Sequence, residues 1–254
     1  MPVLNEIAEP GGQPERRIGR VLKSMSLGRR RVTLAVSGKD PMSPFETVSA
    51  TQAYRERCED RVAVFTHEER TVVVVADGAG GTGAGDVAAH VVIREIESAY
   101  LNIHSAIEWA SLLRQIDCRI GDGETTAVVV DVRTIGIAGA SVGDSRAIIV
   151  TDGTISDLTV NQNRKPLLGT GMAEPIGFVC PPLDGLLLLG TDGFFNYAKP
   201  SAILASIAKS DFQTLPRRCI DMVRLPSGDY WDDVGVVAVR NRPRSSTRRR
   251  FTVD

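Results

Sequence analysis

The sequence lacks the features that usually direct a protein to a membrane or a nucleic acid. No apolar run in its 254 residues approaches the roughly 18 residues that cross a bilayer, and the N-terminus has no apolar segment typical of a signal peptide. The formal net charge is only -1, so the chain as a whole has no excess of either sign. We therefore expect a soluble cytoplasmic protein with neither a membrane nor a nucleic acid as partner.

Cysteine is also sparse. The four cysteines are widely spaced, no two of them form a paired motif, and no histidine stands near any of them: Cys58, Cys118, Cys180 and Cys219. This spacing argues against a zinc site and is typical of reduced thiols in the cytoplasm. Nothing in the sequence indicates an oligomeric state.

The chain does have enough apolar residues for one large folded unit. Hydrophobic residues make up 43% of the sequence and charged residues 24%. We expect a single domain over residues 31–240. A loosely ordered arm over residues 1–30 is expected before it, and an Arg-rich disordered tail over residues 241–254 after it.

Strands and helices are predicted in blocks. Apolar and β-branched segments predict strands over 31–37, 60–66, 71–76, 125–131, 135–141, 147–151, 154–158, 186–190 and 234–240. Helical spacing predicts helices over 87–100, 107–116, 201–209 and 215–225. Strands and helices do not alternate as they do in a doubly wound sheet. We therefore expect an α+β sandwich of mainly antiparallel sheets with helices on the outer faces.

Three aspartates far apart in the sequence each stand at the end of an apolar strand. Asp77 follows the run 72–76, Asp192 follows the run 186–190 by two residues, and Asp232 stands just before 234–240. Carboxylates that converge in a buried place repel one another unless they share a positive charge. The pattern predicts a pair of divalent metal ions.

These segments also permit two other interpretations. An aspartate before glycine is often an ordinary turn residue, as we expect for Asp152 and Gly153. The glycines of 78–83 match a dinucleotide-binding fingerprint. However, Asp77 would then face the pyrophosphate, and a second helix follows where a parallel strand is needed, so we favour the metal site.

Six short motifs follow one another along the chain. They are Arg55–Asp60, Asp77–Gly81, Thr125–Ala127, Val142–Arg146, Thr191–Gly193 and Asp232–Asp233. In this order they resemble the motifs of the metal-dependent serine/threonine protein phosphatases of type 2C, over about residues 31–240. The resemblance implies a four-layer sandwich, with two central antiparallel β-sheets flanked by helix pairs, in agreement with the order of predicted elements.

The resemblance also implies metal ligands. Asp77 would bridge two ions, the carbonyl of Gly78 would complete one coordination sphere, and Asp192 and Asp232 would hold the other ion. Glu59 would act through bound water. An all-oxygen set of this kind suits Mg²⁺ or Mn²⁺ better than zinc.

Further residues are assigned by resemblance, two of them with alternatives. Asp144 would contribute to a third, weaker metal position, with a structural turn aspartate as the alternative. Arg55 would grip the substrate phosphate, with Arg57 as its competitor. Thr125 and its neighbour Thr126 are expected to support the site rather than to react.

The implied reaction is hydrolysis of phosphoserine and phosphothreonine in proteins by a hydroxide that bridges the two metals. Asp77, Asp192 and Asp232 are then the candidate catalytic residues. The implied partners are a phosphorylated protein substrate and a cognate kinase or regulatory protein.

The chain departs from the family pattern at two places. Ala79 stands where many members have a histidine that is proposed to protonate the leaving oxygen, and the flap between Thr159 and Gly169 is mostly missing. These departures keep two alternatives open: a catalytically weak phosphoprotein-binding regulatory module, and a phosphohydrolase of small molecules.

Overall fold

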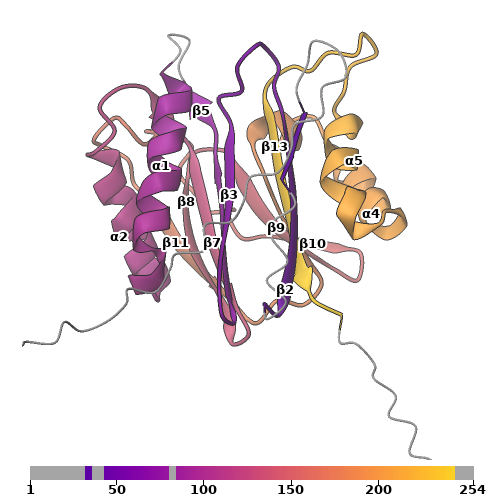
Figure 1. The fold of residues 1–254 in the computed structure, drawn as a ribbon, viewed down its shortest axis with the longest axis horizontal. Coiled ribbons are helices and arrows are strands. Elements are labelled where there is room, and N and C mark those ends of the chain that lie inside the picture. Colours follow the sequence, from indigo (N-terminus) through magenta and orange to yellow (C-terminus); the bar gives the residue numbers. More distant parts are fainter. Residues whose placement is uncertain (1–31, 36–42, 80–83, 244–254) are drawn as a thin grey trace, which may run out of the picture.

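Two antiparallel β-sheets lie face to face in the protein, and each carries a pair of helices on its outer side (Figure 1). The computed structural model describes residues 32–35, 43–79 and 84–243. The α+β four-layer sandwich predicted from the sequence is confirmed. The predicted N-terminal arm and residues 244–254 of the predicted tail lie outside the described residues.

The first sheet has six strands in the order β1-β2-β13-β12-β9-β10, and every neighbouring pair is antiparallel. Its strands are β1 (Val32–Ala35), β2 (Phe45–Gln52), β9 (Arg146–Thr151), β10 (Thr154–Asp157), β12 (Leu186–Gly190) and β13 (Val234–Asn241). The end of β12 that leads to Asp192 and the start of β13 that follows Asp232 are adjacent, because Gly190 pairs with Val236.

The second sheet has five strands in the order β11-β8-β7-β4-β3, again antiparallel throughout. Its strands are β3 (Arg61–His67), β4 (Arg70–Ala76), β7 (Ala127–Arg133), β8 (Gly136–Val142) and β11 (Ile176–Cys180). A small third ladder pairs β5 (Gly78–Ala79) with β6 (Glu124–Thr125) beyond the end of β4.

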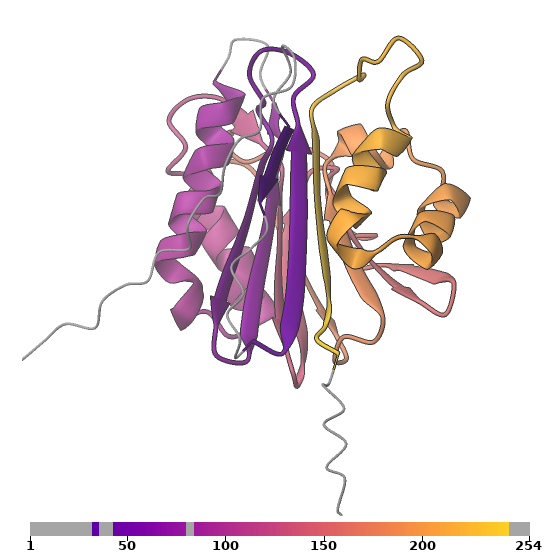
Figure 2. The ribbon, with the colours of Figure 1, turned by 45° about the vertical axis from the view of Figure 1, so that its right-hand side comes forward.

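Helices cover the outer faces of both sheets (Figure 2). The elements are α1 (Gly85–Ala99), η1 (Tyr100–Asn102) and α2 (Ala106–Asp117) on the five-stranded sheet, and α3 (Asp192–Phe195), α4 (Pro200–Lys209), η2 (Phe212–Thr214) and α5 (Leu215–Met222) on the other. A capping box starts α2, in which the Ser105 hydroxyl and the Glu108 carboxylate each accept a hydrogen bond from the other residue's backbone. Among the described residues, no helix combines the length and apolar character needed to cross a membrane.

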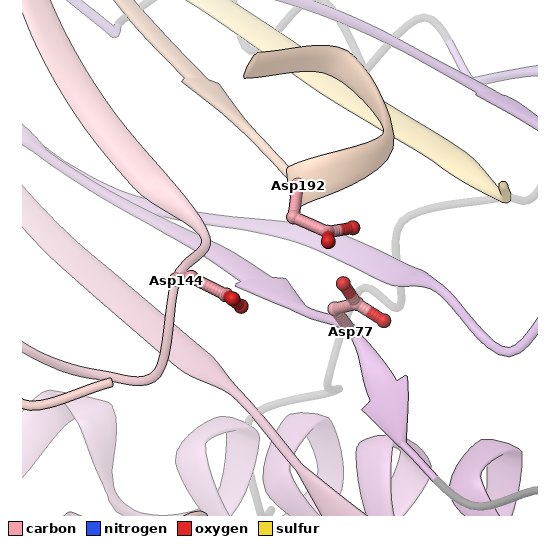
Figure 3. Close-up of side chains that lie close together, drawn as sticks. All are labelled: Asp77, Asp144 and Asp192. Carbon is pink, nitrogen blue, oxygen red and sulfur yellow. The ribbon is translucent and has the colours of Figure 1, made fainter. Parts of the chain in front are cut away.

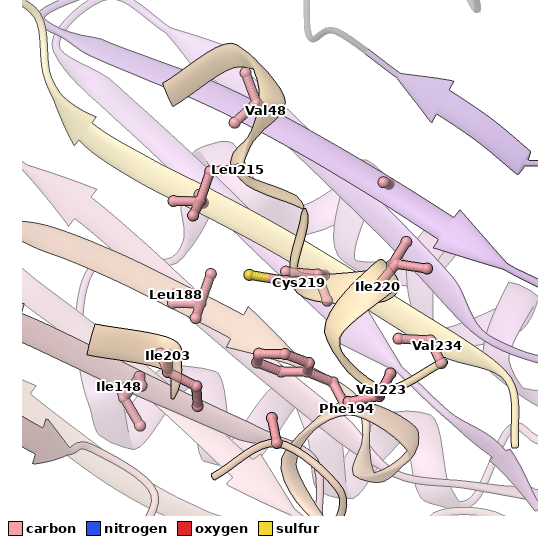
Figure 4. Packing of buried hydrophobic residues seen from close by; sticks show 14 of the residues in the cluster. Val48, Ile148, Leu188, Phe194, Ile203, Leu215, Cys219, Ile220, Val223 and Val234 are labelled. Atoms are coloured by element: carbon pink, nitrogen blue, oxygen red, sulfur yellow. The ribbon is translucent and has the colours of Figure 1, made fainter. Parts of the chain in front are cut away.

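Three layers of apolar side chains separate the four layers of backbone. Val73 and Val75 of β4 share the central layer with Leu187 and Leu189 of β12. The alternate residues of the same strands face the helices, since side chains of a strand point to opposite sides in turn. Leu188, for example, packs with residues of α3 and α5 (Figure 4).

The structure adds strands that the sequence did not predict, and it corrects one prediction in detail. β2, β11 and the two-residue β5 were not predicted. The single strand predicted over 125–131 is divided into β6 and β7, because Thr126 turns its hydroxyl and its backbone to Asp77. The tight turn at Asp152 and Gly153 is confirmed, with φ of 49° and 77° at the two residues.

We predict that Leu187→Ala destabilises the protein by roughly 2–5 kcal/mol, because Leu187 is fully buried between the sheets and its truncation leaves a cavity. Denaturant unfolding of Leu187→Ala and of the unsubstituted protein measures this loss. Ile135→Ala is the control: Ile135 is 83% exposed, so its truncation should change the free energy of unfolding by less than about 0.5 kcal/mol. Equal effects of the two substitutions would contradict the three-layer core.

Candidate metal centre

Three aspartates from separate elements converge at one end of the sandwich. Asp77, Asp144 and Asp192 each offer one carboxylate oxygen, and these oxygens lie within 4.8 Å of one another (Figure 3). Each of the three side chains is half-buried. The convergence that the sequence predicts for Asp77 and Asp192 is therefore present, and Asp144 joins them.

The backbone of Asp77 is fixed by two neighbouring threonines. The Asp77 N–H donates to Thr126 Oγ1 at 3.0 Å, and the Thr126 N–H donates back to the Asp77 carbonyl at 2.9 Å. The Thr125 hydroxyl also donates to the Asp77 carbonyl at 2.8 Å. Both hydroxyls are thus engaged in holding Asp77, which supports the prediction that the threonines do not react.

Asp144 lies in a turn that is tied to Thr126. The Ser145 and Thr126 hydroxyls are 2.8 Å apart, and the Gly143 N–H donates to the Asn163 carbonyl at 2.8 Å. Gly143 has a φ of 100°, a conformation that a residue with a side chain rarely adopts. The turn therefore needs this glycine to present Asp144 toward Asp77.

Asp192 is the first residue of the single helical turn α3. The hydroxyl of Thr191 before it donates to Asp60 Oδ2 at 2.7 Å and accepts the Gly235 N–H at 2.9 Å. Asn196 Nδ2 donates to Asp192 Oδ2 at 3.0 Å. Thr191 thus links the end of β12, the start of β13 and a buried aspartate around Asp192.

Asp232 stands outside the group of three, and its neighbour Asp233 has a different task. Asp232 Oδ1 accepts the N–H of Asp233 at 2.8 Å. Asp233 is 8% exposed, and its two carboxylate oxygens accept the N–H of Tyr54 at 2.6 Å and of Glu59 at 2.5 Å. Asp233 therefore clamps both ends of the loop that carries Arg55.

Arg55 faces the acidic centre from this loop. Its guanidinium stacks over the Tyr54 ring at 5.3 Å. Burial raises the pKa of both Glu59 and Asp232, and the positive charge of Arg55 acts on both in the opposite direction. Arg57 instead pairs with Asp86 at 3.9 Å, and its side chain is 82% exposed. The positions thus favour Arg55 over Arg57 as the residue that reaches the centre.

The carboxylates of the centre disfavour one another's charge. Burial is the main cause that raises the pKa of Asp77, and the negative charges of Asp60 and Asp192 raise it further. Burial likewise raises the pKa of Asp192 and of Asp232. The negative charge of Asp232 raises the pKa of Asp192 further. The metal-free protein therefore holds these groups at an electrostatic cost that a cation would relieve.

The residues present fit a divalent metal. Asp60 is fully buried, and its Oδ1 atom has no hydrogen-bond partner, as expected for an acceptor that serves a water or an ion. A Cβ on Gly85 would lie 2.8 Å from the Gly78 carbonyl oxygen and 2.9 Å from Glu59 Oε2, so this glycine leaves space for two proposed oxygen ligands. All the donors are oxygens, which Mg²⁺ and Mn²⁺ prefer.

The loop over residues 158–175, called the short loop below, joins β10 to β11 and lies beside Asp144, where Arg164 Nη2 is 3.7 Å from Asp144 Oδ2. The carboxylate of Asp117, at the end of α2, accepts backbone N–H groups from Gly169 at 2.7 Å, Gly171 at 3.0 Å and Ala173 at 2.9 Å. Leu168 pairs with Thr125 of β6 in both directions. The loop is thereby tied to the same strand that supports Asp77.

The fold is shared with solved bacterial enzymes. A bacterial serine phosphatase, crystallised as a variant with one arginine replaced by alanine, superposes with a TM-score of 0.70 at 21% identity, over 78% of this chain and 99% of that one. PppA of Pseudomonas aeruginosa, a regulatory component of T6SS, reaches 0.63 at 19% identity, over 79% and 99%. The chain has the bacterial serine/threonine phosphatase fold. The resemblance drawn from the six motifs is confirmed.

Two further relatives of this phosphatase fold are informative. The catalytic domain of PstP, solved with two manganese ions, gives a TM-score of 0.64 at 19% identity, over 77% of this chain and 97% of that one. In sequence, the serine/threonine phosphatase Stp of Listeria welshimeri is 28% identical over 160 residues. That match spans 55% of this chain and 64% of the relative. No protein-family model matches the chain.

The dinucleotide-binding alternative has no support in the phosphatase fold. Residues 80–83 lie outside the described part, but β4 leads through β5 to α1 and then to a second helix, and the strands on both sides of β4 are antiparallel to it. The parallel strand that such a motif needs is therefore missing beside β4. Ala79 lies in β5 opposite Glu124.

Three residues around the centre were not assigned from the sequence. Asp60, Thr191 and Asp233 hold the loops and strands that carry the proposed ligands. Both aspartates follow another acidic residue and stand immediately before a strand, the same signal that pointed to Asp232. That signal could have identified the two aspartates. The role of Thr191 has no such signal, because its partner Asp60 lies 131 residues away in the sequence.

We predict that Asp192→Asn stabilises the metal-free protein while removing its response to metal. Loss of one charge relieves repulsion by about 1 kcal/mol, which corresponds to a rise of about 2–4 °C in Tm for a domain of this size. Thermal melting with chelator and with Mn²⁺ measures both effects. The matched control is Asp184→Asn, an exposed aspartate before β12 at the end away from Asp192, which should change neither value. A Tm for Asp192→Asn that still rises with Mn²⁺ as in the unsubstituted protein would contradict the assignment.

We also predict that Asp233→Asn loosens the loop of Arg55. An amide offers one acceptor where the carboxylate offers two, so one backbone N–H loses its partner, at a cost of roughly 1.5–3 kcal/mol. Urea unfolding measures this loss, and increased hydrogen exchange at Tyr54 or Glu59 localises it. Unchanged exchange in the loop would show that Asp233 is not the clamp.

Proposed function

We propose that the protein is a metal-dependent phosphatase that removes phosphate from phosphoserine and phosphothreonine in proteins. The observation that carries this proposal is the convergence of Asp77, Asp144 and Asp192 on one point, beside the unpartnered Oδ1 of buried Asp60. The relatives in sequence and in fold are named as serine/threonine phosphatases, which agrees with it.

Two Mn²⁺ or Mg²⁺ ions fit this centre. Asp77, the Gly78 carbonyl, Asp192 and Asp232 would hold the pair, and Glu59 would contribute indirectly. Asp144 would add a third, weaker position, since one of its carboxylate oxygens lies within 4.8 Å of those that Asp77 and Asp192 offer. The manganese pair in PstP supports two ions, and the oxygen ligands suit either metal.

The chemistry that a bound divalent pair supplies is activation of water at neutral pH and neutralisation of phosphoryl charge. The chain's own residues then orient the substrate. Arg55 would bind the phosphate through its planar guanidinium, and Asp233 would keep Arg55 in place through the two ends of its loop. Asp60 Oδ1 would accept a proton or hydrogen bond from the attacking water. Ala79 has no proton to donate to the leaving oxygen, and in the proposed reaction a water would donate it instead.

Hydrolysis of a phosphothreonine peptide tests the function directly. We expect release of phosphate that requires added Mn²⁺ or Mg²⁺, is abolished by chelator, and falls by at least about 100-fold in Asp192→Asn, since a lost ligand disables charge stabilisation in the transition state. Asp184→Asn should retain full activity. Turnover that is equal in chelator and in metal would overturn the proposal.

The same assay separates the two alternatives left open by Ala79 and the short loop. A regulatory module would bind phosphopeptides without metal-dependent turnover at any metal concentration. A phosphohydrolase of small molecules would release phosphate from phosphorylated metabolites in preference to phosphopeptides. Either result would replace the proposed function.

A further inference from the structure

The exposed aromatic side chains of the protein gather beside the candidate metal centre. Among the described residues, three aromatic side chains are exposed: Tyr54 at 41%, Tyr197 at 45% and Trp231 at 60%. Tyr54 donates its N–H to Asp233, Tyr197 follows α3, and Trp231 directly precedes Asp232. Exposed aromatic rings on a folded domain indicate a surface that binds something, because they leave a large apolar area in water.

Two of these rings form a stacked pair. The ring centroids of Tyr197 and Trp231 lie 6.2 Å apart, and the ring planes differ by 18°. The pair is close to the proposed ligands, because Trp231 directly precedes Asp232 and Asn196, the residue before Tyr197, donates to Asp192 Oδ2 at 3.0 Å. This stacked pair, called the Tyr197–Trp231 platform below, therefore leaves aromatic surface exposed beside the candidate metal centre.

The charge around the platform favours a cation as its occupant. Near the centre, acidic side chains outnumber the arginines that act on them, which are Arg55 and, 3.7 Å from Asp144, Arg164. The acidic residues are Glu59, Asp60, Asp77, Asp144, Asp192, Asp232 and Asp233. Arg55 already stacks on the third ring, Tyr54. No arginine or lysine of the described residues stacks on Trp231, although an indole is the aromatic ring that attracts a cation most strongly.

We propose that the Tyr197–Trp231 platform binds an arginine side chain of the substrate polypeptide, within a few residues of the phosphorylated serine or threonine. This inference rests on the proposed phosphatase function and deepens it, because it names the sequence that the site prefers. Stacking against Trp231 would hold the guanidinium plane, and the surplus carboxylates would supply the charge attraction. An acidic residue at the same place in the substrate is repelled, and an apolar residue gains only the stacking.

The experiment measures hydrolysis of three kinds of phosphothreonine peptide in the presence of Mn²⁺. The first kind has alanine at every position that flanks the phosphorylated residue. In the second and third kinds, one arginine or one glutamate replaces alanine at each flanking position in turn. For the unsubstituted protein we expect kcat/KM to be higher for one arginine peptide than for the alanine peptide by about fivefold, the size expected of a partly exposed cation–π contact. Trp231→Ala should reduce this arginine-to-alanine ratio to about one, since the indole is the ring that holds the guanidinium. Trp231→Phe should keep part of the preference.

The control is Ile107→Ala, which truncates an 82% exposed apolar residue on α2 and should keep the full arginine preference. An arginine preference that survives in Trp231→Ala overturns the inference, as does an equal loss of activity on all the peptides, which would mean that Trp231 only supports Asp232. In both cases hydrolysis of the alanine peptide by the unsubstituted protein leaves the proposed function standing. Failure to hydrolyse any of the peptides overturns the function itself, and this inference with it.

Discussion

Repulsion between half-buried carboxylates is the constraint around which this end of the protein is built. Asp77, Asp144 and Asp192 would move apart in a flexible chain, because the ion pair of 3.7 Å between Asp144 and the exposed Arg164 offsets only part of their charge. The structure holds them together through their backbones: the Thr126 hydroxyl accepts the Asp77 N–H, and the Thr191 hydroxyl accepts the Gly235 N–H and donates to Asp60. The carboxylates are therefore held in place without a cation, so the proposed metal ions would require little reorganisation of the site.

The spacing of the centre depends on the layer between the two sheets. Asp77 comes from the five-stranded sheet and Asp192 from the six-stranded sheet, while Asp144 lies on the turn that joins β8 of one to β9 of the other. The distance between these elements is set by the valine and leucine side chains of the central core, since packed sheets lie about 10 Å apart. The apolar residues of this layer thus help to set the spacing of the three aspartates.

The elements with strong local signals were predictable from the sequence. The valines of β4 and the leucines of β12 are continuous and buried, so the strands and the acids at their ends could be recognised together. The sequence of β2 mixes polar and apolar residues, and this strand is held by neighbours on both sides, including an ion pair of 2.7 Å between Glu46 and Arg240 of β13. Such a partner, 194 residues away, has no signature in the local pattern.

The candidate site was predictable to a similar depth. The motifs named the residues that stand at strand ends, and the fold brings Asp77, Asp144 and Asp192 together. The residues that hold them were not recognised, because their partners are distant in sequence, as with Asp233 and Tyr54. A role as a clamp depends on which backbone N–H groups a carboxylate faces, and this is a property of the folded chain alone.

The short loop beside Asp144 is held at both of its ends, so residues can be inserted between these ends. The far half of the loop is fixed by one carboxylate at three N–H groups, and the near half is fixed where Asn163 meets Gly143. Extra residues inserted between Thr159 and Asn163 would leave both attachments intact and would add only the slowly growing entropy of a longer loop. A lid of almost any size could thus be grafted here or removed without disturbing the sandwich, and proteins that share this architecture are free to differ in how much of their reaction centre they cover.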